Sequence, residues 1–263
     1  MKVAGILAVA WLLVSVVWSL AVNAAPDPVF KSEAIGTPGS NARAELYRPA
    51  GPGPFPAMVV LPGCDGVGPH YRLWAQQLRD WGYVALLIDS FRPRGFTIVC
   101  NHGMEVPPLV QAQDAFAAAD YLRGLAFVAA DRIGVIGFSH GGWAVLKAVL
   151  SGTVLQNHAT PFAVAVAFYP GCQRPETALA TDTLILIGDA DDWTPVGYCE
   201  RWSEVVRRGG RSLELKVYPG ALHGFDAPAL PHSYAGHFVG RDPVAAADAL
   251  VVSRGFLAQH LSP

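Results

Sequence analysis

The feature that most constrains the fold of this chain is a regular alternation of short apolar runs with longer segments of helical periodicity. The apolar runs are rich in β-branched residues, which is typical of strands buried on both faces of a parallel sheet. Strands are predicted over residues 57–61, 83–88, 133–137, 163–168, 183–187 and 213–217. Helices are predicted over residues 71–81, 109–125, 143–150, 196–208 and 243–261. This order predicts an α/β fold with a doubly wound, mostly parallel sheet and helices on both faces. A further strand over residues 42–47 is expected to add an antiparallel edge.

Length and composition favour one globular domain that spans residues 25–263. Of the 263 residues, 52% are hydrophobic, which is enough to fill a sizeable core. After the first fifty residues, neither a linker nor an internal repeat divides the chain. The formal net charge of -2 and the lack of a basic stripe argue against nucleic acid as a partner. The sequence carries no signal for an oligomeric state.

The first residues form a separate segment with the pattern of a secretory signal peptide. Lys2 is followed by an uncharged apolar run over residues 3–22 and then by small residues. We expect residues 1–24 to be the signal peptide, with cleavage after Ala24. The chain would then be exported, periplasmic or secreted, and would have no attachment to a membrane after cleavage. An uncleaved membrane anchor is the alternative, because the apolar run is long for a signal peptide.

The cysteines support an oxidising compartment. An even number of cysteines in an exported chain favours disulfides. Cys64 and Cys100 follow strands in the first half of the chain, whereas Cys172 and Cys199 follow strands in the second half. We therefore expect bridges Cys64–Cys100 and Cys172–Cys199 ahead of the other two pairings, with four reduced thiols as the alternative. The chain has no Cys-x-x-Cys pair, so no metal site is expected.

The run from Val135 to Gly142 reads VIGFSHGG and contains a Gly-x-Ser-x-Gly motif at the end of a predicted strand. A serine on a sharp strand-to-helix turn exposes its hydroxyl group, and flanking glycines let backbones approach closely. Ser139 is therefore the candidate nucleophile. The alternative is a tight turn of small residues with no catalytic role.

The acid candidate lies just after the predicted strand over residues 183–187. A serine nucleophile needs a base to take its proton and an acid to orient that base. Three carboxylates compete at this position, and we favour Asp191, with Asp192 second; Asp189 is expected to hydrogen-bond its own turn. The alternative for the whole cluster is an acidic turn that caps the next helix.

The base candidate is His223, on a Gly-flanked loop after the predicted strand over residues 213–217. The order Ser139, Asp191, His223 is that of α/β-hydrolases. His140 adjoins the candidate nucleophile, and its side chain is expected to point away from it. His232 and His237 are expected on a less structured stretch. The remaining histidines fall outside the expected order and are His70, His102, His158 and His260.

Two backbone N–H groups are candidates for an oxyanion hole. Acyl transfer through a tetrahedral intermediate needs donors aimed at the developing negative charge. The N–H of His140 follows the candidate nucleophile directly. The second donor is expected from the loop after the strand over residues 57–61, where we choose the N–H of Cys64. The alternative is a glycine-rich turn without a catalytic role.

Motifs over nearly the whole mature chain resemble the dienelactone hydrolase family. They are LPGCDG at 61–66, Tyr71-x-x-Trp74-Ala75, WGYV at 81–84, DSFRPRG at 89–95, GFSHG at 137–141, residues 188–195 and YPG-x-x-HGF at 218–225. The resemblance implies an α/β-hydrolase fold and cleavage of a small-molecule ester or lactone without a metal or organic cofactor. It also favours Asp191, because the acid of that family stands four residues before a proline, here Pro195.

The chain also departs from the founding members of that family, which use a cysteine nucleophile supported by a glutamate and by arginines that hold the substrate carboxylate. Here Ser139 occupies the nucleophile position. Gly63 stands about where the glutamate is expected, and Ala227 stands where an arginine is expected. Arg92 or Arg94 is a candidate to meet an acidic group of the substrate, with a structural role as the alternative for each. Dienelactone itself is therefore not the expected substrate.

These observations predict an exported serine hydrolase that cleaves carboxylic esters, including lactones, through an acyl-enzyme. An amidase or peptidase with the same triad is one alternative, since the chemical groups are identical. A non-catalytic envelope binding protein that keeps the fold is the other.

Overall fold

The computed structural model describes residues 29–34, 37–101, 105–152, 158, 160–173, 177–206 and 208–261. The predicted signal peptide, residues 1–24, lies outside the described residues, so that its cleavage stays a prediction. None of the described helices is both long enough and apolar enough to cross a bilayer.

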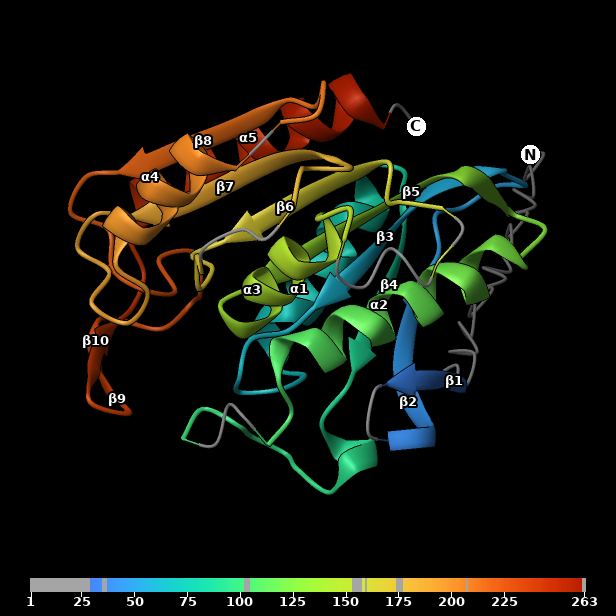
Figure 1. Cartoon of the computed structure of the whole chain (residues 1–263), viewed down its shortest axis with the longest axis horizontal. Coiled ribbons are helices and arrows are strands. Elements are labelled where there is room, and N and C mark those ends of the chain that lie inside the picture. The colour runs from blue at the N-terminus through green and yellow to red at the C-terminus, as the bar shows by residue number, and fades with distance from the viewer. Residues whose placement is uncertain are drawn as a thin grey trace, which may run out of the picture.

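The molecule is built on an eight-stranded sheet with the order β1-β2-β4-β3-β5-β6-β7-β8 (Figure 1). The strands are β1 (Val29–Ala34), β2 (Thr37–Tyr47), β3 (Phe55–Leu61), β4 (Val84–Asp89), β5 (Val128–Phe138), β6 (Val164–Phe168), β7 (Asp182–Gly188) and β8 (Leu213–Tyr218). In the sheet order from β4 to β8, which includes β3, all neighbouring strands are parallel. β2 is antiparallel to both of its neighbours. Every residue of β4 and β6 is buried. This burial explains the uninterrupted apolar runs in the sequence.

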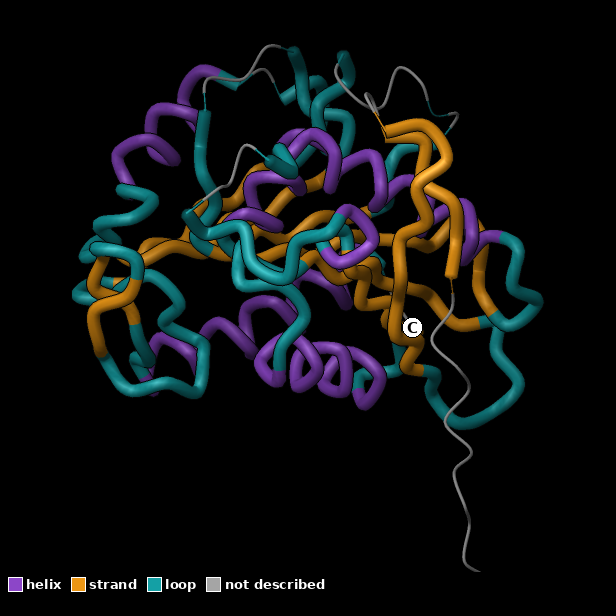
Figure 2. The backbone as a smooth tube through the Cα atoms, turned by 90° about the horizontal axis from the view of Figure 1, so that it is seen from below, coloured by secondary structure: helices purple, strands orange, loops and turns teal. Residues whose placement is uncertain are grey.

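Helices cover both faces of this sheet (Figure 2). They are α1 (Pro69–Asp80), α2 (Pro108–Arg123), α3 (His140–Ala148), α4 (Val196–Val205) and α5 (Pro243–His260), with a short 3-10 helix η1 (Arg92–Arg94). The predicted doubly wound α/β architecture is therefore confirmed.

The strand order reverses at the centre of the sheet, and this reversal positions the site. β3 lies between β4 and β5, so the chain leaves β3 toward one edge and returns on its other side at β5. In open α/β sheets, ligands bind beyond the carboxyl ends of the strands at such a switch point. The loops that follow β3 and β5 carry Cys64 and Ser139.

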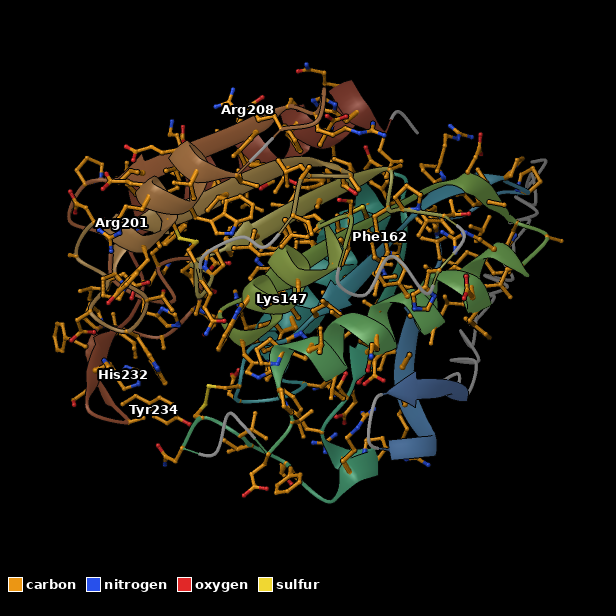
Figure 3. The ribbon with its side chains drawn as sticks, in the orientation of Figure 1. Lys147, Phe162, Arg201, Arg208, His232 and Tyr234 are labelled. Carbon is orange, nitrogen blue, oxygen red and sulfur yellow. A yellow bond between two sulfur atoms is a disulfide. The ribbon has the colours of Figure 1, made fainter. Side chains whose placement is uncertain are left out.

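Two expectations about the periphery were wrong. The strand predicted over residues 42–47 is present and antiparallel, but it is not an edge, because β1 pairs with the outer side of β2. The polar and charged residues of β1 hide it from an apolar-run search. The stretch around His232 was expected to be irregular, but it forms a hairpin of β9 (His232–Tyr234) and β10 (His237–Val239). Figure 3 shows His232 and Tyr234 on this hairpin, at the end of the molecule where β7 and β8 finish.

Candidate active site

Ser139 occupies a strained turn between β5 and α3. Its φ of 52° and ψ of -112° lie in a region that non-glycine residues rarely adopt. The turn is held by a hydrogen bond from the Ser139 N–H to the Phe168 carbonyl, 2.9 Å, and by one from the Trp143 N–H to the Ser139 carbonyl, 2.8 Å. A Cβ added at Gly137 would collide with the backbone of Gly141, and one at Gly141 with the backbone of Leu61. The two glycines of the motif are thus required for the turn.

A hydrogen-bonded chain joins Ser139 to His223 and Asp191. The Ser139 Oγ lies 2.8 Å from Nε2 of His223, and Nδ1 of the same ring lies 2.8 Å from Oδ2 of Asp191. His223 and Asp191 are buried, with exposed fractions of 5% and 4%. The structure thus brings together the three side chains that were expected to form a triad.

The competing carboxylates lie elsewhere. Asp192 contacts the hairpin, with Oδ1 3.4 Å from Nδ1 of His237. Asp189 accepts a hydrogen bond from the Gly220 N–H at 2.6 Å, a partner on the loop after β8 and not in its own turn as expected. Of these three aspartates, Asp191 is the one that reaches His223.

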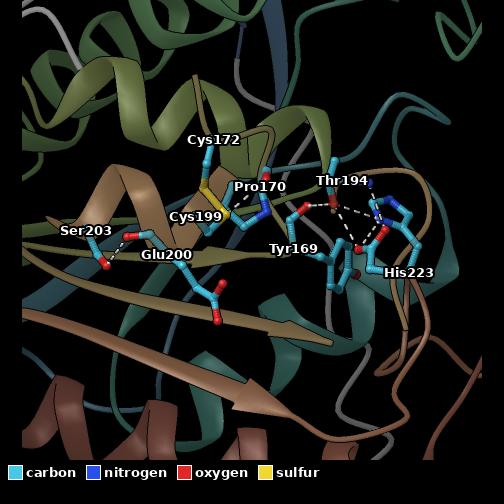
Figure 4. Close-up of a disulfide and its surroundings, with 9 residues drawn as sticks. Tyr169, Pro170, Cys172, Thr194, Cys199, Glu200, Ser203 and His223 are labelled. Carbon is cyan, nitrogen blue, oxygen red and sulfur yellow. Dashed lines mark hydrogen bonds and ion pairs between the residues drawn. A yellow bond between two sulfur atoms is a disulfide. The ribbon is translucent and has the colours of Figure 1, made fainter. Parts of the chain in front are cut away.

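Thr194 and the backbone beside it fix the carboxylate of Asp191. Oδ1 accepts the N–H groups of Trp193 and Thr194 at 2.9 and 2.8 Å, and Oδ2 lies 2.9 Å from the Thr194 hydroxyl. The same hydroxyl lies 3.1 Å from the Tyr169 carbonyl and 3.2 Å from Nδ1 of His223 (Figure 4). Sequence reasoning missed Thr194, although an aspartate followed three residues later by threonine is a recognisable turn pattern.

A residue that the sequence did not indicate hydrogen-bonds to both segments that carry the candidate oxyanion donors. Gln111 of α2 donates from Nε2 to the Pro62 carbonyl at 3.1 Å, and its Oε1 lies 2.8 Å from Nδ1 of His140. Since the amide oxygen can only accept, Nδ1 of His140 carries the proton. His140 is the first residue of α3, where N–H groups have no partner within the helix. Its side chain thus contacts Gln111 of α2.

Two disulfides border the site. The structure pairs Cys64 with Cys100 and Cys172 with Cys199, which is the expected pairing. The first bridge attaches the loop after β3 to the segment that ends at Cys100, where the Val99 N–H also donates to the Cys64 carbonyl at 2.7 Å. The second bridge lies beside the Tyr169 and Thr194 contacts (Figure 4).

Two cavities open on Ser139 and share Cys64, Cys100 and Trp193 in their walls. The first, which we call the Trp143 cavity, has a volume of about 440 Å³ and is also lined by Trp143, Pro195 and Tyr198. The second, which we call the Asp65 cavity, has a volume of about 300 Å³ and is also lined by Asp65, His70, Tyr71, Tyr169 and His223. An ester held at Ser139 can place its acyl and alcohol groups in separate spaces.

The expectation that Arg92 or Arg94 contacts the substrate finds no support in this geometry. The Arg94 guanidinium is buried and forms an ion pair with Asp114 of α2 at 2.7 Å. Arg92 is half exposed and lies 3.5 Å from Asp89. Neither arginine is among the described residues that line the two cavities. The buried ion pair of Arg94 fits the structural role that was the alternative, whereas the role of Arg92 stays a prediction.

A buried anion lies beneath the Asp65 cavity. Asp226 accepts hydrogen bonds at 2.7 Å from the indole N–H of Trp74 and from the hydroxyl of Tyr169, and Nε2 of His70 lies 3.3 Å away. Burial opposes the charge of Asp226, but His70 and these donors hold the pKa of that carboxyl below its usual range. Burial likewise opposes a charged imidazole, but Asp226 raises the pKa of His70. The ion pair connects the His223 loop to α1.

The described residues contain no group of three or more His, Cys, Asp or Glu side chains arranged to hold a metal ion. The arrangement that they do contain, a serine, a histidine and an aspartate beyond the carboxyl ends of β5, β8 and β7, is that of an α/β-hydrolase.

Residues 42–261 match the model of the dienelactone hydrolase family. The chain belongs to this family. The family and its fold were both predicted from the sequence motifs, and both are confirmed.

Curated relatives with similar sequences are named as a lactonase and as a carboxymethylenebutenolidase. The chain is 29% identical over 211 residues to a Bradyrhizobium protein named "Probable 2-oxo-3-(5-oxofuran-2-ylidene)propanoate lactonase", with 73% of this chain and 82% of the relative covered. It is 26% identical over 234 residues to the carboxymethylenebutenolidase of Rhodococcus opacus, with 82% and 90% covered. Among solved structures, esterase 2 of Thermogutta terrifontis has the same fold, with a TM-score of 0.68, 19% identity and 92% and 97% of the two chains covered.

Proposed function

We propose that this protein is a serine hydrolase that cleaves carboxylic esters, including lactones, through an acyl-enzyme. The observation that carries the proposal is the chain of two 2.8 Å hydrogen bonds from Ser139 Oγ through His223 to Asp191. The lactone-hydrolase names of the curated relatives and the esterase name of the structural neighbour support the bond type.

In the first half of the reaction, Nε2 of His223 takes the proton of the Ser139 hydroxyl as Oγ attacks the ester carbonyl carbon. Asp191 orients the imidazole and stabilises the imidazolium that forms. The N–H groups of Cys64 and His140 would donate to the oxyanion of the tetrahedral intermediate. His223 then gives its proton to the departing alkoxide, which leaves as the alcohol.

In the second half, His223 removes a proton from water, and the resulting hydroxide attacks the acyl carbonyl. Collapse of the second tetrahedral intermediate releases the carboxylic acid and returns the proton to Ser139. In a lactone, the alcohol and the acid belong to one molecule, so a single hydroxy acid is released. These steps use groups of this chain and water.

The compartment belongs to the same proposal. Disulfides persist in oxidising environments, and the described residues contain two of them and no free cysteine. Together with the apolar N-terminal segment, these bridges support an exported protein with residues 1–24 removed as a signal peptide. Mass spectrometry of the N-terminus of the protein recovered from its native host tests this, and an intact Met1 would contradict it.

A fluorophosphonate probe tests the nucleophile. Esterase 2 of Thermogutta terrifontis has been solved phosphorylated by paraoxon, so a reactive phosphoryl compound is a suitable probe for this fold. We expect labelling of the folded protein and none of the Ser139→Ala variant. Equal labelling of the two proteins, or none of either, would contradict the hydrolase and favour a binding protein.

Matched nitrophenyl esters and nitroanilides of varied acyl length test the bond type. We expect faster turnover of the esters. Faster turnover of the anilides would assign the triad to an amidase or peptidase.

A further inference from the structure

The Asp65 cavity carries a carboxylate next to the proposed nucleophile. Asp65 follows Cys64 directly in the loop after β3, and its side chain is exposed toward the cavity that Ser139 and His223 also line. A group of the substrate that enters this cavity therefore meets a negative charge as well as the catalytic histidine.

Contacts with two neighbouring residues fix the position of this carboxylate. The hydroxyl of Tyr71, a buried residue of α1, donates a hydrogen bond to Oδ1 of Asp65. This contact depends on Gly63, because a Cβ at that position would lie 2.7 Å from the Tyr71 hydroxyl and 3.0 Å from Oδ1 of Asp65. The hydrogen bond uses Oδ1 of the carboxylate, and the Asp65 side chain lines the cavity.

The charges around the cavity leave Asp65 without a dedicated cation. No lysine or arginine is among the described residues of its wall. The imidazoles of this wall are those of His70, His223 and His232, and that of His70 lies 3.3 Å from the buried Asp226. His223 is the proposed base, and Nδ1 of His232 lies 2.8 Å from the Leu230 carbonyl. Since His70 and Asp226 carry opposite charges, they largely compensate one another, and the wall retains the charge of Asp65.

We propose that Asp65 determines substrate charge: the enzyme prefers esters whose group in the Asp65 cavity is neutral or cationic, and it discriminates against esters that place a carboxylate there. This inference rests on the proposed function, because it concerns the same serine and the same cavity. The Trp143 cavity, with its aromatic and disulfide wall, receives the uncharged remainder of the substrate.

The test compares matched esters in the wild-type protein and in Asp65→Asn, which removes the charge and keeps an oxygen acceptor for Tyr71. The acyl series is the nitrophenyl esters of pentanoate, of glutarate with its second carboxylate free, and of 4-(trimethylammonio)butanoate. The alcohol series is 4-nitrophenyl acetate and its 3-carboxy derivative. Each kcat/KM is divided by that of the neutral ester of its series on the same protein.

We expect Asp65→Asn to raise the anionic-to-neutral ratio by about five- to tenfold in at least one series. Where that is the acyl series, its cationic-to-neutral ratio should fall by a similar factor. In the wild type, salt at about 1 M should reduce the discrimination to less than about twofold, since it screens an exposed charge.

Asp65→Glu should retain the selectivity. Asp80→Asn, the same charge change at the remote end of α1, should leave both ratios unchanged. An effect of Asp65 on the His223 imidazolium acts on all esters alike and cancels in the ratios.

Ratios that stay within about twofold of the wild-type values in both series would contradict the charge selection and leave Asp65 as a structural partner of Tyr71. The proposed function would then stand, provided that hydrolysis of the neutral ester still depends on Ser139. A neutral ester that is hydrolysed equally by wild type and Ser139→Ala would contradict the proposed function itself, and this inference with it.

Discussion

Ser139 shows how a single residue stores backbone strain at the site. A non-glycine residue at φ 52° costs on the order of 1–3 kcal/mol, and the surrounding contacts have to maintain it. Here the Phe168 carbonyl holds its N–H at 2.9 Å, and its own carbonyl accepts the Trp143 N–H at 2.8 Å. The strained backbone is what directs Oγ toward Nε2 of His223 and away from the body of the sheet.

Asp191 can be tested against its neighbours in the acidic cluster. We expect Asp191→Asn to lower kcat for a neutral ester by on the order of 10⁴-fold, because the amide no longer favours the tautomer of His223 that accepts the serine proton. Asp192→Asn and Asp189→Asn, which remove the same charge from the same cluster, should retain at least about half of the wild-type kcat. Steady-state kinetics on folded variants measures this. A larger loss for Asp192→Asn than for Asp191→Asn would move the role to Asp192.

Thr194 is expected to act through Asp191. Thr194→Val keeps the side-chain shape but removes the hydroxyl that lies 2.9 Å from Oδ2 of Asp191, and a single hydrogen bond of this kind corresponds to a decrease in kcat of about five- to tenfold. Thr194→Ser should restore most of the activity. If valine and serine gave the same kcat, the hydroxyl would have no role in positioning the acid.

Residues with a local signal could be predicted, whereas residues whose partners are distant in the chain could not. Ser139, Asp191 and His223 each follow a predicted strand, so their order selected the three positions, and the family resemblance strengthened the choice of Asp191 over Asp192. Gln111 and Arg94 carry no comparable signal. Gln111 bonds to Pro62 and His140, 49 and 29 residues away, and the burial of Arg94 follows from its pairing with Asp114 on α2.

At the scale of the elements, loops and not helices carry most of the site. The loop after β3 is attached at Cys64 by the bridge to Cys100, while the loop after β6 is attached at Cys172 by the bridge to Cys199 of α4. Parallel strands place all of these loops at one edge of the sheet. The sequence predicted the strands well because burial on both faces leaves long apolar runs, but β1 and the β9–β10 hairpin lack such runs and were missed.

The two disulfides provide a matched pair of variants. Replacing both cysteines of either bridge by serine should lower the free energy of unfolding by about 2–4 kcal/mol, since the bridges close segments of similar length, 36 and 27 residues. Loss of the Cys64–Cys100 bridge should also lower kcat by about tenfold or more, because the proposed oxyanion donor at Cys64 is no longer held.

Denaturant titration and ester kinetics on both double variants measure these effects. The Cys172–Cys199 variant is the control, with a similar loss of stability and a smaller change in kcat. Equal kcat values for the two variants would show that the first bridge is not needed to hold the proposed oxyanion donor at Cys64.

At the scale of the whole molecule, the buried charges connect parts of the fold that lie far apart in the chain. Asp226 follows His223 by three residues and bonds to Trp74 of α1 and to Tyr169 after β6, partners 152 and 57 residues away. The loop that carries His223 is thus anchored to elements from both halves of the chain. No periodicity in the sequence indicates such a contact, since its partners lie on elements that are far apart in the chain.

The His70–Asp226 pair predicts how stability depends on pH. The pKa of His70 is raised above its ordinary value of 6.5, and the pKa of Asp226 is lowered below its ordinary value of 3.8. The contribution of His70 is therefore complete below pH 6.5 and is lost as the pH rises through its raised pKa in the folded state. The contribution of Asp226 is complete above pH 3.8 and is lost as the pH falls through its lowered pKa.

We accordingly expect the free energy of unfolding to decrease as the pH rises above 6.5 through the raised pKa of His70, and His70→Gln to remove part of that decrease. Asp65 and Arg241 also act on the His70 imidazole, with opposite signs, so the slope is compared between wild type and variant and not taken from the wild type alone. Urea titrations at several pH values measure it, and His232→Gln, a change at an exposed histidine of the hairpin, is the matched control. An unchanged slope in His70→Gln would show that His70 carries no charge in the folded protein, and the anchor of the His223 loop would then be the hydrogen bonds of Trp74 and Tyr169 alone.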